Sequence, residues 1–387
     1  MAFTAFPEQT LPAWKRAVLK VGSSLLAGEG GLSPRHATHI ASFVHAMHAQ
    51  GREVVIVSSG AVAAGRSVLR DAPRGGAAMA ERQALAALGQ ARLMGFWQGF
   101  FARPVAQVLL THDDVRNRSR YLNAQATLRE LLQCGALPVV NENDTVSVDE
   151  LKLGDNDTLA AIVATLVDAD VLILATDIDG LYDRDPRAHA DAVPLATVTD
   201  PGDEVLAMAG GAGSAVGTGG MRTKVLAAQR AGAAGIDTLL VNGTRAEAFA
   251  ALARDRLVGT RLVAGRSRIA ARKHWLRHAP AEPGAIVVDA GALAALRDRG
   301  ASLLPIGVVG AEGEFRRGDM VEVVLRESTG EVRVARGVTQ YSAADIRRIA
   351  RQPSQAIAGI LGYHYGETII HRDDLSLLVN PREPVDG

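Results

Sequence analysis

Between Ala17 and about Val263 the sequence alternates short apolar runs with longer amphipathic stretches. The short runs are nearly continuous and rich in β-branched residues, as expected for parallel strands buried on both faces. They are Ala17–Val21, Glu53–Ser58, Val105–Leu110, Leu137–Asn141, Val171–Thr176 and Thr238–Val241. The amphipathic stretches predict helices over Pro34–Gln50, Ala77–Phe101, Ser119–Gln133 (with Ser119 as cap), Thr158–Val167 and Met221–Ala231. This alternation predicts an α/β domain, an open, mostly parallel sheet sandwiched by helices, with functional loops at the carboxyl ends of its strands.

The pattern changes after Gly265. A basic, proline-containing stretch comes first, and from Gly284 short strand-like segments alternate with glycine turns. These segments predict a small β-rich barrel of about 80 residues. We therefore expect a loose N-terminal extension, an α/β domain, a linker, a β-rich domain and a polar tail, with boundaries at residues 1–15, 16–264, 265–282, 283–374 and 375–387.

Charge and cysteine content exclude several classes of protein. Basic and acidic residues number 42 each, so the basic surplus of a dedicated nucleic-acid binder is missing. Cys134 is the single cysteine, which rules out an internal disulfide and suggests a reducing compartment. No apolar run reaches about 18 residues, and the N-terminus lacks the pattern of a signal peptide. We expect a cytoplasmic protein without a membrane partner.

Lysine is rare, and its positions are informative. Of the 42 basic residues only five are Lys and 37 are Arg, so a retained Lys suggests a need for a compact ammonium group. Lys20 lies near the end of the first predicted strand, before Gly22 and two serines, a setting that suits phosphate oxygens. Lys224 lies in the first turn of a predicted helix, directly after the glycine-rich segment 210–220. A cation there opposes the helix dipole unless an anion neutralises both.

Three further loops follow predicted strands. Ser58–Ala61 would let backbone amides approach a ligand, although an ordinary tight turn explains it as well. Asn141–Asp144 and Lys152–Asp157 gather carboxylates and amides that could bind a cation, an amino group or only solvent. Thr176–Tyr182 is a polar loop or a surface turn. No Walker A loop, dinucleotide fingerprint or protein-kinase motif occurs in the sequence.

Taken together, these segments resemble the amino acid kinase family, most closely its members that phosphorylate glutamate. The resemblance runs from about Ala17 to Asp374. The C-terminal part, with Ser302–Pro305 and Gly362–Tyr363, resembles the PUA domain appended to bacterial members. Two of the five lysines, Lys20 and Lys224, fall in the motifs that carry the resemblance, and Lys152 lies just before one of them. The motifs are Val18–Ser23, Ser58–Gly65, Asn141–Asp144, Gly154–Asp157 and Gly217–Lys224.

The resemblance implies a role for each residue. Lys20 and Lys224 would hold the β- and γ-phosphates, with Asp157 between them as the third catalytic residue. Phosphoryl transfer needs mainly positioning and charge stabilisation, which lysines supply. The implied substrate-binding residues are Ser59, Gly60, Asp144 and Asn156. The implied ATP-binding residues are Lys20, Gly22, Thr176, Asp177, Thr218, Gly219, Gly220, Met221, Arg222, Thr223 and Lys224.

The implied reaction is ATP-dependent phosphorylation of the γ-carboxylate of L-glutamate, the first step of proline biosynthesis. A glutamate side chain has a pKa of about 4.3 and needs no general base at neutral pH. Mg²⁺ would be bound to the ATP phosphates, with no protein ligands assigned. Family behaviour further implies inhibition by proline, transfer of γ-glutamyl phosphate to glutamate-5-semialdehyde dehydrogenase, and a homo-oligomer.

Two alternatives stay open. A kinase of the same fold could act on N-acetylglutamate or aspartate, although Asp144 favours a substrate with a free α-ammonium. The chain could instead be an RNA-binding PUA protein with a regulatory kinase-like domain. Its basic cluster would be Arg347, Arg348 and Arg351, for which a solvated helix face is the simpler explanation.

Overall fold

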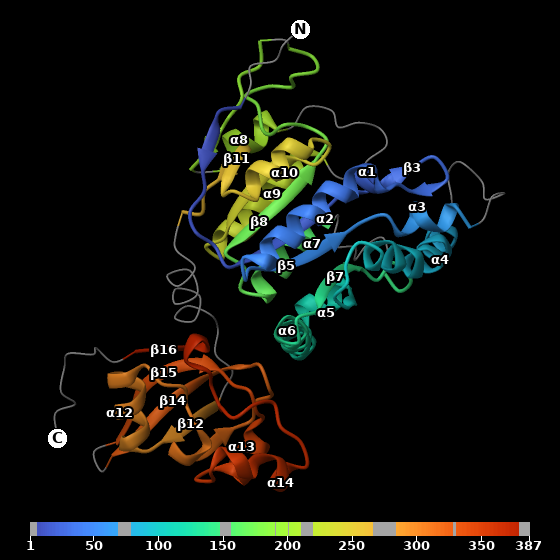
Figure 1. Cartoon of the computed structure of the whole chain (residues 1–387). Coiled ribbons are helices and arrows are strands. Elements are labelled where there is room, and N and C mark those ends of the chain that lie inside the picture. The colour runs from blue at the N-terminus through green and yellow to red at the C-terminus, as the bar shows by residue number, and fades with distance from the viewer. Residues whose placement is uncertain are drawn as a thin grey trace. The chain divides into compact units, whose positions relative to one another are not determined.

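The chain divides into two compact units, residues 1–268 and 269–387 (Figure 1). Each unit has its own hydrophobic core. No helix in the described ranges combines the length and apolar character needed to cross a membrane. This computed structural model describes residues 6–68, 79–147, 156–189, 191–199, 201–209, 220–265, 284–327 and 330–378.

In the N-terminal unit the described residues form a nine-stranded sheet, ordered β1-β11-β10-β8-β2-β5-β7-β6, with β9 beside β11. The six strands from β10 to β6 are mutually parallel, which confirms the predicted fold class. They are β2 (Arg16–Val21), β5 (Glu53–Ser58), β6 (Val105–Leu110), β7 (Leu137–Glu142), β8 (Val171–Thr176) and β10 (Asp237–Asn242). Next to β10 the sheet continues with β11 (Arg256–Leu262), a strand that was not expected. Strand β11 also pairs with β9 (Thr197–Val198) and β1 (Glu8–Thr10).

Helices cover both faces of this sheet (Figure 1). Neighbouring strand residues such as Val18 and Leu19 point into opposite cores, one on each face. One core is closed by α1 (Ser23–Leu26), α2 (Pro34–Ala49), α4 (Met79–Gln98) and α10 (Ala246–Leu252). The other is closed by α6 (Arg118–Gln133), α7 (Asn156–Leu166), α8 (Asp203–Met208) and α9 (Met221–Ala233).

The shorter elements connect these layers. A small hairpin of β3 (Ala27–Gly28) and β4 (Gly31–Leu32) precedes α2, while α3 (Ala61–Arg66) and α5 (His112–Arg116) follow β5 and β6. The expected cap of α6 is wrong. Asn117, not Ser119, accepts the capping hydrogen bond, from the Arg120 amide at 3.2 Å. Ser119 instead donates its hydroxyl to Asn117 Oδ1 at 2.8 Å.

Helices α3 and α4 touch through their backbones at two glycines. A Cβ atom on Gly65 would lie 1.9 Å from the Leu85 carbonyl oxygen, and one on Gly89 would lie 1.7 Å from that of Ala61. Only glycine permits so close an approach. The glycine contact fixes α4 against α3 and the loop that joins β5 to α3.

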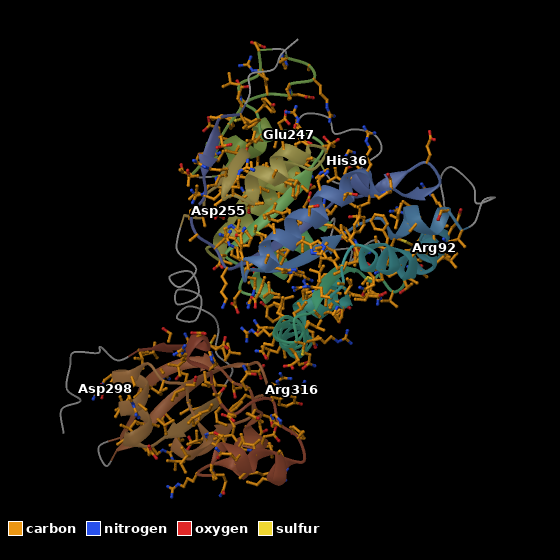
Figure 2. The ribbon with its side chains drawn as sticks, viewed as in Figure 1. His36, Arg92, Glu247, Asp255, Asp298 and Arg316 are labelled. Carbon is orange, nitrogen blue, oxygen red and sulfur yellow. The ribbon has the colours of Figure 1, made fainter. Side chains whose placement is uncertain are left out.

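On the solvent side of the helices that cover the sheet, Arg92 of α4 and Glu247 of α10 are exposed (Figure 2).

The expected loose N-terminal extension is wrong from Phe6 onward. Strand β1 pairs with β11, and the Gln9 side chain donates to the Ala196 carbonyl at 2.7 Å. Phe6 is 7% exposed and packs edge-on against Tyr182, with ring centroids 5.2 Å apart. A Cβ atom on Gly180 would lie 2.6 Å from the Phe6 ring, so the segment after β8 is shaped around this side chain.

In the C-terminal unit, five described strands form a sheet ordered β13-β12-β14-β15-β16, in which only β12 and β14 are parallel neighbours. Leu303 and Ile370 form an isolated antiparallel bridge. The expected tail from residue 375 begins later, because β16 pairs with β15. The strands are β12 (Gly284–Val288), β13 (Val308–Gly313), β14 (Met320–Glu327), β15 (Gly330–Val338) and β16 (Leu375–Leu377).

Three helices complete this sheet-rich unit. They are α12 (Ala290–Arg299), α13 (Ala343–Ile349) and α14 (Ile357–Leu361), and α12 was not expected from the sequence. Short 3-10 turns lie at Pro305–Gly307, Ser354–Ala356 and Arg372–Asp374. The buried Tyr341 donates its hydroxyl to the Gly366 carbonyl at 2.6 Å, which ties the segment after α14 to the core.

Replacing Phe6 with Ala should lower the free energy of unfolding by about 3 kcal/mol, because a buried ring would leave a cavity. Urea denaturation followed by circular dichroism measures the change. Leu88→Ala, at a position 42% exposed on α4, is the control and should cost less than about 1 kcal/mol. Equal stability of the two variants would mean that the N-terminal segment is not part of the folded unit.

Candidate active site

Four loops meet where the parallel strands end. The carboxyl ends of β8, β2, β5 and β7 are neighbours in the sheet, and Val21 lies in register with both Ala175 and Ser58. In open α/β sheets this edge is where ligands bind. It carries the predicted residues at the ends of β2 and β8, the loop before α3, and the turn containing Asp144.

The centre of this edge is a buried carboxylate held by two lysines. Asp157 Oδ1 lies 2.7 Å from Lys20 Nζ, and Asp157 Oδ2 lies 3.0 Å from Lys224 Nζ. Asp157 is fully buried, and each lysine side chain is 8% exposed. The three residues come from the end of β2, the first turn of α7 and the first turn of α9. Two ammonium groups share one carboxylate, so these three side chains together carry one excess positive charge.

The two lysines keep Asp157 ionised. Burial acts to raise its pKa, but the charges of Lys20 and Lys224 and their hydrogen bonds outweigh it, and the pKa lies below its ordinary value. The Thr223 hydroxyl donates to Asp157 Oδ2 at 2.9 Å. Asp157 also supplies the anion that a lysine in the first turn of α9 requires, since the positive end of the helix dipole lies there.

Glycines shape the loops beside the lysines. Gly60 has a φ of 112°, in the left-handed region that favours glycine, and it caps α3. The Ser59 amide donates to the Val21 carbonyl at 3.0 Å, which ties the loop after β5 to the end of β2. Gly22 caps α1, and a Cβ atom there would lie 3.5 Å from Lys20 Nζ. The backbone around the lysines is therefore left open to a ligand.

A chain of amide side chains lies on the other side of the edge. Asn156 Nδ2 donates to Ser59 Oγ at 2.6 Å and to Asn141 Oδ1 at 3.1 Å. Asn141 Nδ2 donates in turn to Gln90 Oε1 on α4 at 3.0 Å. The structure thus joins the predicted Ser59 and Asn156 directly. Gln90 was missed, although Gln83, Gln90 and Trp97 recur every seven residues on an otherwise alanine-rich helix.

The remaining predicted residues surround this centre. Thr176 and Asp177 follow β8, and their hydrogen bond is to each other, 3.3 Å from Thr176 Oγ1 to Asp177 Oδ1. Asp177 also lies 3.7 Å from Arg187. Asp144 is partly exposed in the turn after β7, and Gly220 to Arg222 begin α9. Thr218 and Gly219 lie outside the described residues, as does segment 148–155.

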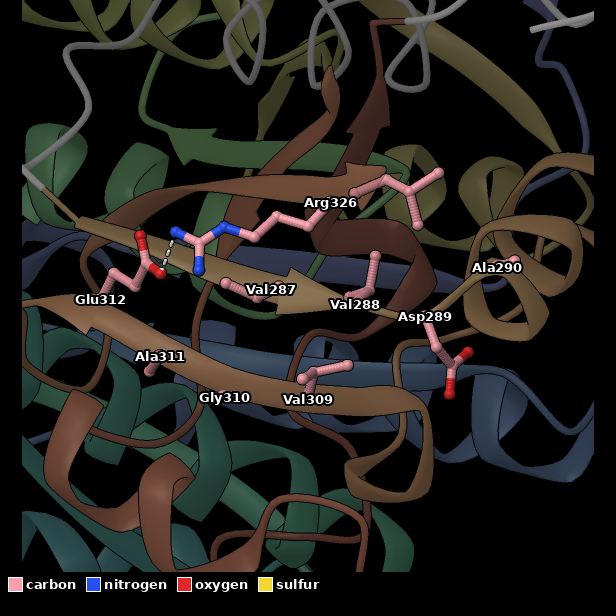
Figure 3. Close-up of a pocket in the computed structure, with 10 residues that line it drawn as sticks. Val287, Val288, Asp289, Ala290, Val309, Gly310, Ala311, Glu312 and Arg326 are labelled. Atoms are coloured by element: carbon pink, nitrogen blue, oxygen red, sulfur yellow. Dashed lines mark ion pairs between the residues drawn. The ribbon is translucent and has the colours of Figure 1, made fainter. Parts of the chain in front are cut away.

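A cavity of about 500 Å³ lies elsewhere, over β12 and β13 of the C-terminal unit (Figure 3). Its walls are mostly apolar, and Arg326 pairs with Glu312 across it. It contains no counterpart of the lysine cluster, so we assign the chemistry to the sheet edge. The lining residues are Val287, Val288, Asp289, Ala290, Val309, Gly310, Ala311, Glu312, Leu325 and Arg326.

The candidate basic cluster of the C-terminal unit is largely engaged. Arg347 lies 3.1 Å from Glu314 and donates to the Ala311 carbonyl at 3.0 Å. Arg348 donates to the Ile360 carbonyl. These contacts favour a structural role over a free phosphate-binding patch. In the described ranges, no three His, Cys, Asp or Glu side chains gather as a metal site would require.

Comparison with known proteins identifies the family. The model of the amino acid kinase family matches residues 15–242. This chain belongs to the amino acid kinase family. A PUA domain model matches residues 284–361. The chain is therefore a kinase, a phosphotransferase, with a separate PUA domain.

Individual relatives extend the match to nearly the whole chain. A glutamate 5-kinase of Xanthomonas campestris pv. campestris (strain 8004) is 70% identical over 362 residues, covering 93% of this chain and 100% of that protein. A glutamate 5-kinase of Xylella fastidiosa (strain M23) is 65% identical over 375 residues, covering 96% and 98%. A solved UMP kinase from Bacillus anthracis is similar with a TM-score of 0.47 at 17% identity, covering 66% and 98%.

Replacing Asp157 with Asn should lower the free energy of unfolding at pH 7 by about 3 kcal/mol, because two buried ammonium groups lose their counter-charge. The folded-state pKa lies below the unfolded value of about 3.9, so the carboxylate stabilises the fold above that pH and ceases to do so as the pH falls through the folded value. The difference in the free energy of unfolding between Asp157→Asn and wild type should therefore become smaller below about pH 4.

Urea denaturation across this pH range measures the effect. Asp191→Asn is the control, because the Asp191 side chain is 77% exposed and lies 3.6 Å from Arg184. A surface pair of this kind contributes at most about 1 kcal/mol. A loss in Asp157→Asn no larger than in this control would contradict the assignment.

Proposed function

We propose that the protein transfers the γ-phosphoryl group of ATP to the γ-carboxylate of L-glutamate, giving γ-glutamyl phosphate and ADP. The observation that carries the proposal is the buried Lys20–Asp157–Lys224 cluster at the ligand-binding edge of the sheet. The two relatives named glutamate 5-kinase, 65–70% identical, support the choice of substrate. The reaction is the first step of proline biosynthesis.

The residues of the site act by positioning and by charge. A carboxylate with an ordinary pKa of about 4.3 is already a nucleophile at neutral pH, so no general base is required. Lys20 and Lys224 bind the β- and γ-phosphate oxygens and stabilise the charge that shifts between them during transfer. Asp157 holds both ammonium groups in place before the nucleotide arrives, which reduces reorganisation during the reaction.

Glutamate binds on the Ser59 side of the edge. Both hydrogens of the Asn156 amide are used by Ser59 and Asn141, which leaves Asn156 Oδ1 and the Ser59 hydroxyl hydrogen for a ligand. Asn156 Oδ1 can accept a hydrogen bond from an ammonium group, and the Ser59 hydroxyl can donate one to a carboxylate. Asp144 supplies a negative charge for the α-ammonium, and the Gly60 amide faces the transferred phosphoryl group.

The nucleotide binds beside the glutamate, along Gly22, Thr176, Asp177 and the first turn of α9. Thr218 and Gly219 are assigned to nucleotide binding by the family resemblance alone. Mg²⁺ would enter as part of Mg-ATP, bound by phosphate oxygens.

We infer four further properties from the same chemistry and the family resemblance. Proline shares an α-carboxylate and a cationic nitrogen with glutamate, so it inhibits by occupying the same groups. An acyl phosphate hydrolyses readily, which favours direct use by glutamate-5-semialdehyde dehydrogenase. The enzyme acts in the cytoplasm as a homo-oligomer.

The test is to incubate the protein with Mg-ATP and hydroxylamine, which traps an acyl phosphate as a hydroxamate that colours with iron. Glutamate, N-acetylglutamate and aspartate are offered separately, each with and without proline. We expect a signal with glutamate alone, reduced by proline. A signal with another acid only would overturn the substrate, and no signal from folded protein that binds ATP would overturn the reaction.

Replacing Lys224 with Ala should lower kcat by about a hundredfold or more, because one phosphate-binding charge is lost. The KM for glutamate should change by less than about threefold. Ser59→Ala is the matched comparison, and it should mainly raise the KM for glutamate. Equal losses of kcat in both variants would contradict this division of roles.

A further inference from the structure

Helix α4 presents a row of polar side chains to the candidate site. Gln83, Gln90 and Trp97 are spaced by seven residues, two helical turns, so they share one face. Gln83 Nε2 donates to the Ser147 carbonyl at 2.9 Å, and Trp97 Nε1 donates to Ser58 Oγ at 2.9 Å. Gln90, between them, accepts from Asn141 at 3.0 Å. Each of these contacts is made to a segment near Ser59 and Asn156, the side of the strands' carboxyl ends that is proposed to bind glutamate.

Gln90 is a buried amide in the middle of this row. It is 9% exposed, and the neighbouring Gly89 presses the backbone of α4 against Ala61 of α3. Its Nε2 is buried without a hydrogen-bond partner among the described residues. A buried amide that makes only one of its bonds is costly to keep, unlike an apolar side chain of the same size. Packing alone therefore does not explain a glutamine here.

The hydrogen-bonded series of amide side chains Gln90, Asn141 and Asn156 explains why a glutamine stands at position 90. An asparagine amide can be turned over with little change of shape, which exchanges its donor and its acceptor. Gln90 Oε1 receives Asn141 Nδ2, so Asn141 Oδ1 faces Asn156. Asn156 must then turn its NH₂ group toward Asn141, and the second hydrogen of that group reaches Ser59. Turning Asn141 over would place two donors against each other.

We propose that Gln90 is a positioning residue that fixes the orientation of Asn141, and through it of Asn156 and Ser59, for amino-acid binding. The inference rests on the proposed function, because the bound amino acid is glutamate. Among the described residues, the hydrogen bond of Gln90 is to Asn141 and not to the lysine cluster of Lys20 and Lys224. Its effect is therefore selective for one of the two substrates.

The test compares Gln90→Met, which keeps the volume of the side chain and removes its acceptor, with wild type in steady-state assays. We expect the KM for glutamate to rise about tenfold, as for a lost hydrogen bond to a buried polar group, while the KM for ATP stays within about twofold. Gln125→Met is the matched control. Gln125 is 7% exposed on α6, and its Nε2 donates to the Leu166 carbonyl at 3.1 Å, on the opposite face of the sheet.

A second variant, Asn141→Ala, removes the link itself and keeps the test valid even if Gln90→Met does not fold. It should raise the KM for glutamate at least as much, and the double variant should be no worse than Asn141→Ala alone. Additive effects, an equal rise in Gln125→Met, or equal rises in both KM values would overturn the proposal. The wild-type hydroxamate assay tests the proposed function separately, because it does not involve these variants.

Discussion

The carboxylate of Asp157, held between two lysines, is the interaction on which the N-terminal unit depends. Its partners lie 137 and 67 positions away along the chain, at Lys20 and Lys224, so three elements must meet at one point. Burying these charges is tolerable only when they are paired at close range. The parallel sheet provides that geometry, because β2, α7 and α9 all begin or end at its carboxyl edge.

The second half of the site depends on a different constraint, the contact between α3 and α4. Gly65 and Gly89 let the two helices approach backbone to backbone, and this fixes both the loop before α3 and the row of polar side chains on α4. One side of the edge is therefore organised by ion pairs and the other by neutral amides. Under the proposed function, glutamate and the polyphosphate of ATP would therefore meet different kinds of groups.

The sequence could predict the central strands because they are buried on both faces, and the lysines because Arg replaces Lys almost everywhere else. It could not predict β11, in which Arg256, Gly259 and Arg261 interrupt the apolar pattern. Strand β1 is only three residues long and becomes visible through its pairing with β11. Gln90 was missed for a similar reason, since its partner Asn141 is 51 positions away and only the fold brings them together.

The excess of positive charge in the cluster links stability to binding. Within the cluster, two buried ammonium groups share one carboxylate, so these three side chains together carry one excess positive charge. A neutral or balanced cluster would be more stable, but it would offer nothing to a phosphate. Under the proposed function, a nucleotide phosphate would complete the charge balance and stabilise the fold by mass action. Under the proposed function, the same two lysines that make the free site costly would also bind the phosphoryl group that is transferred.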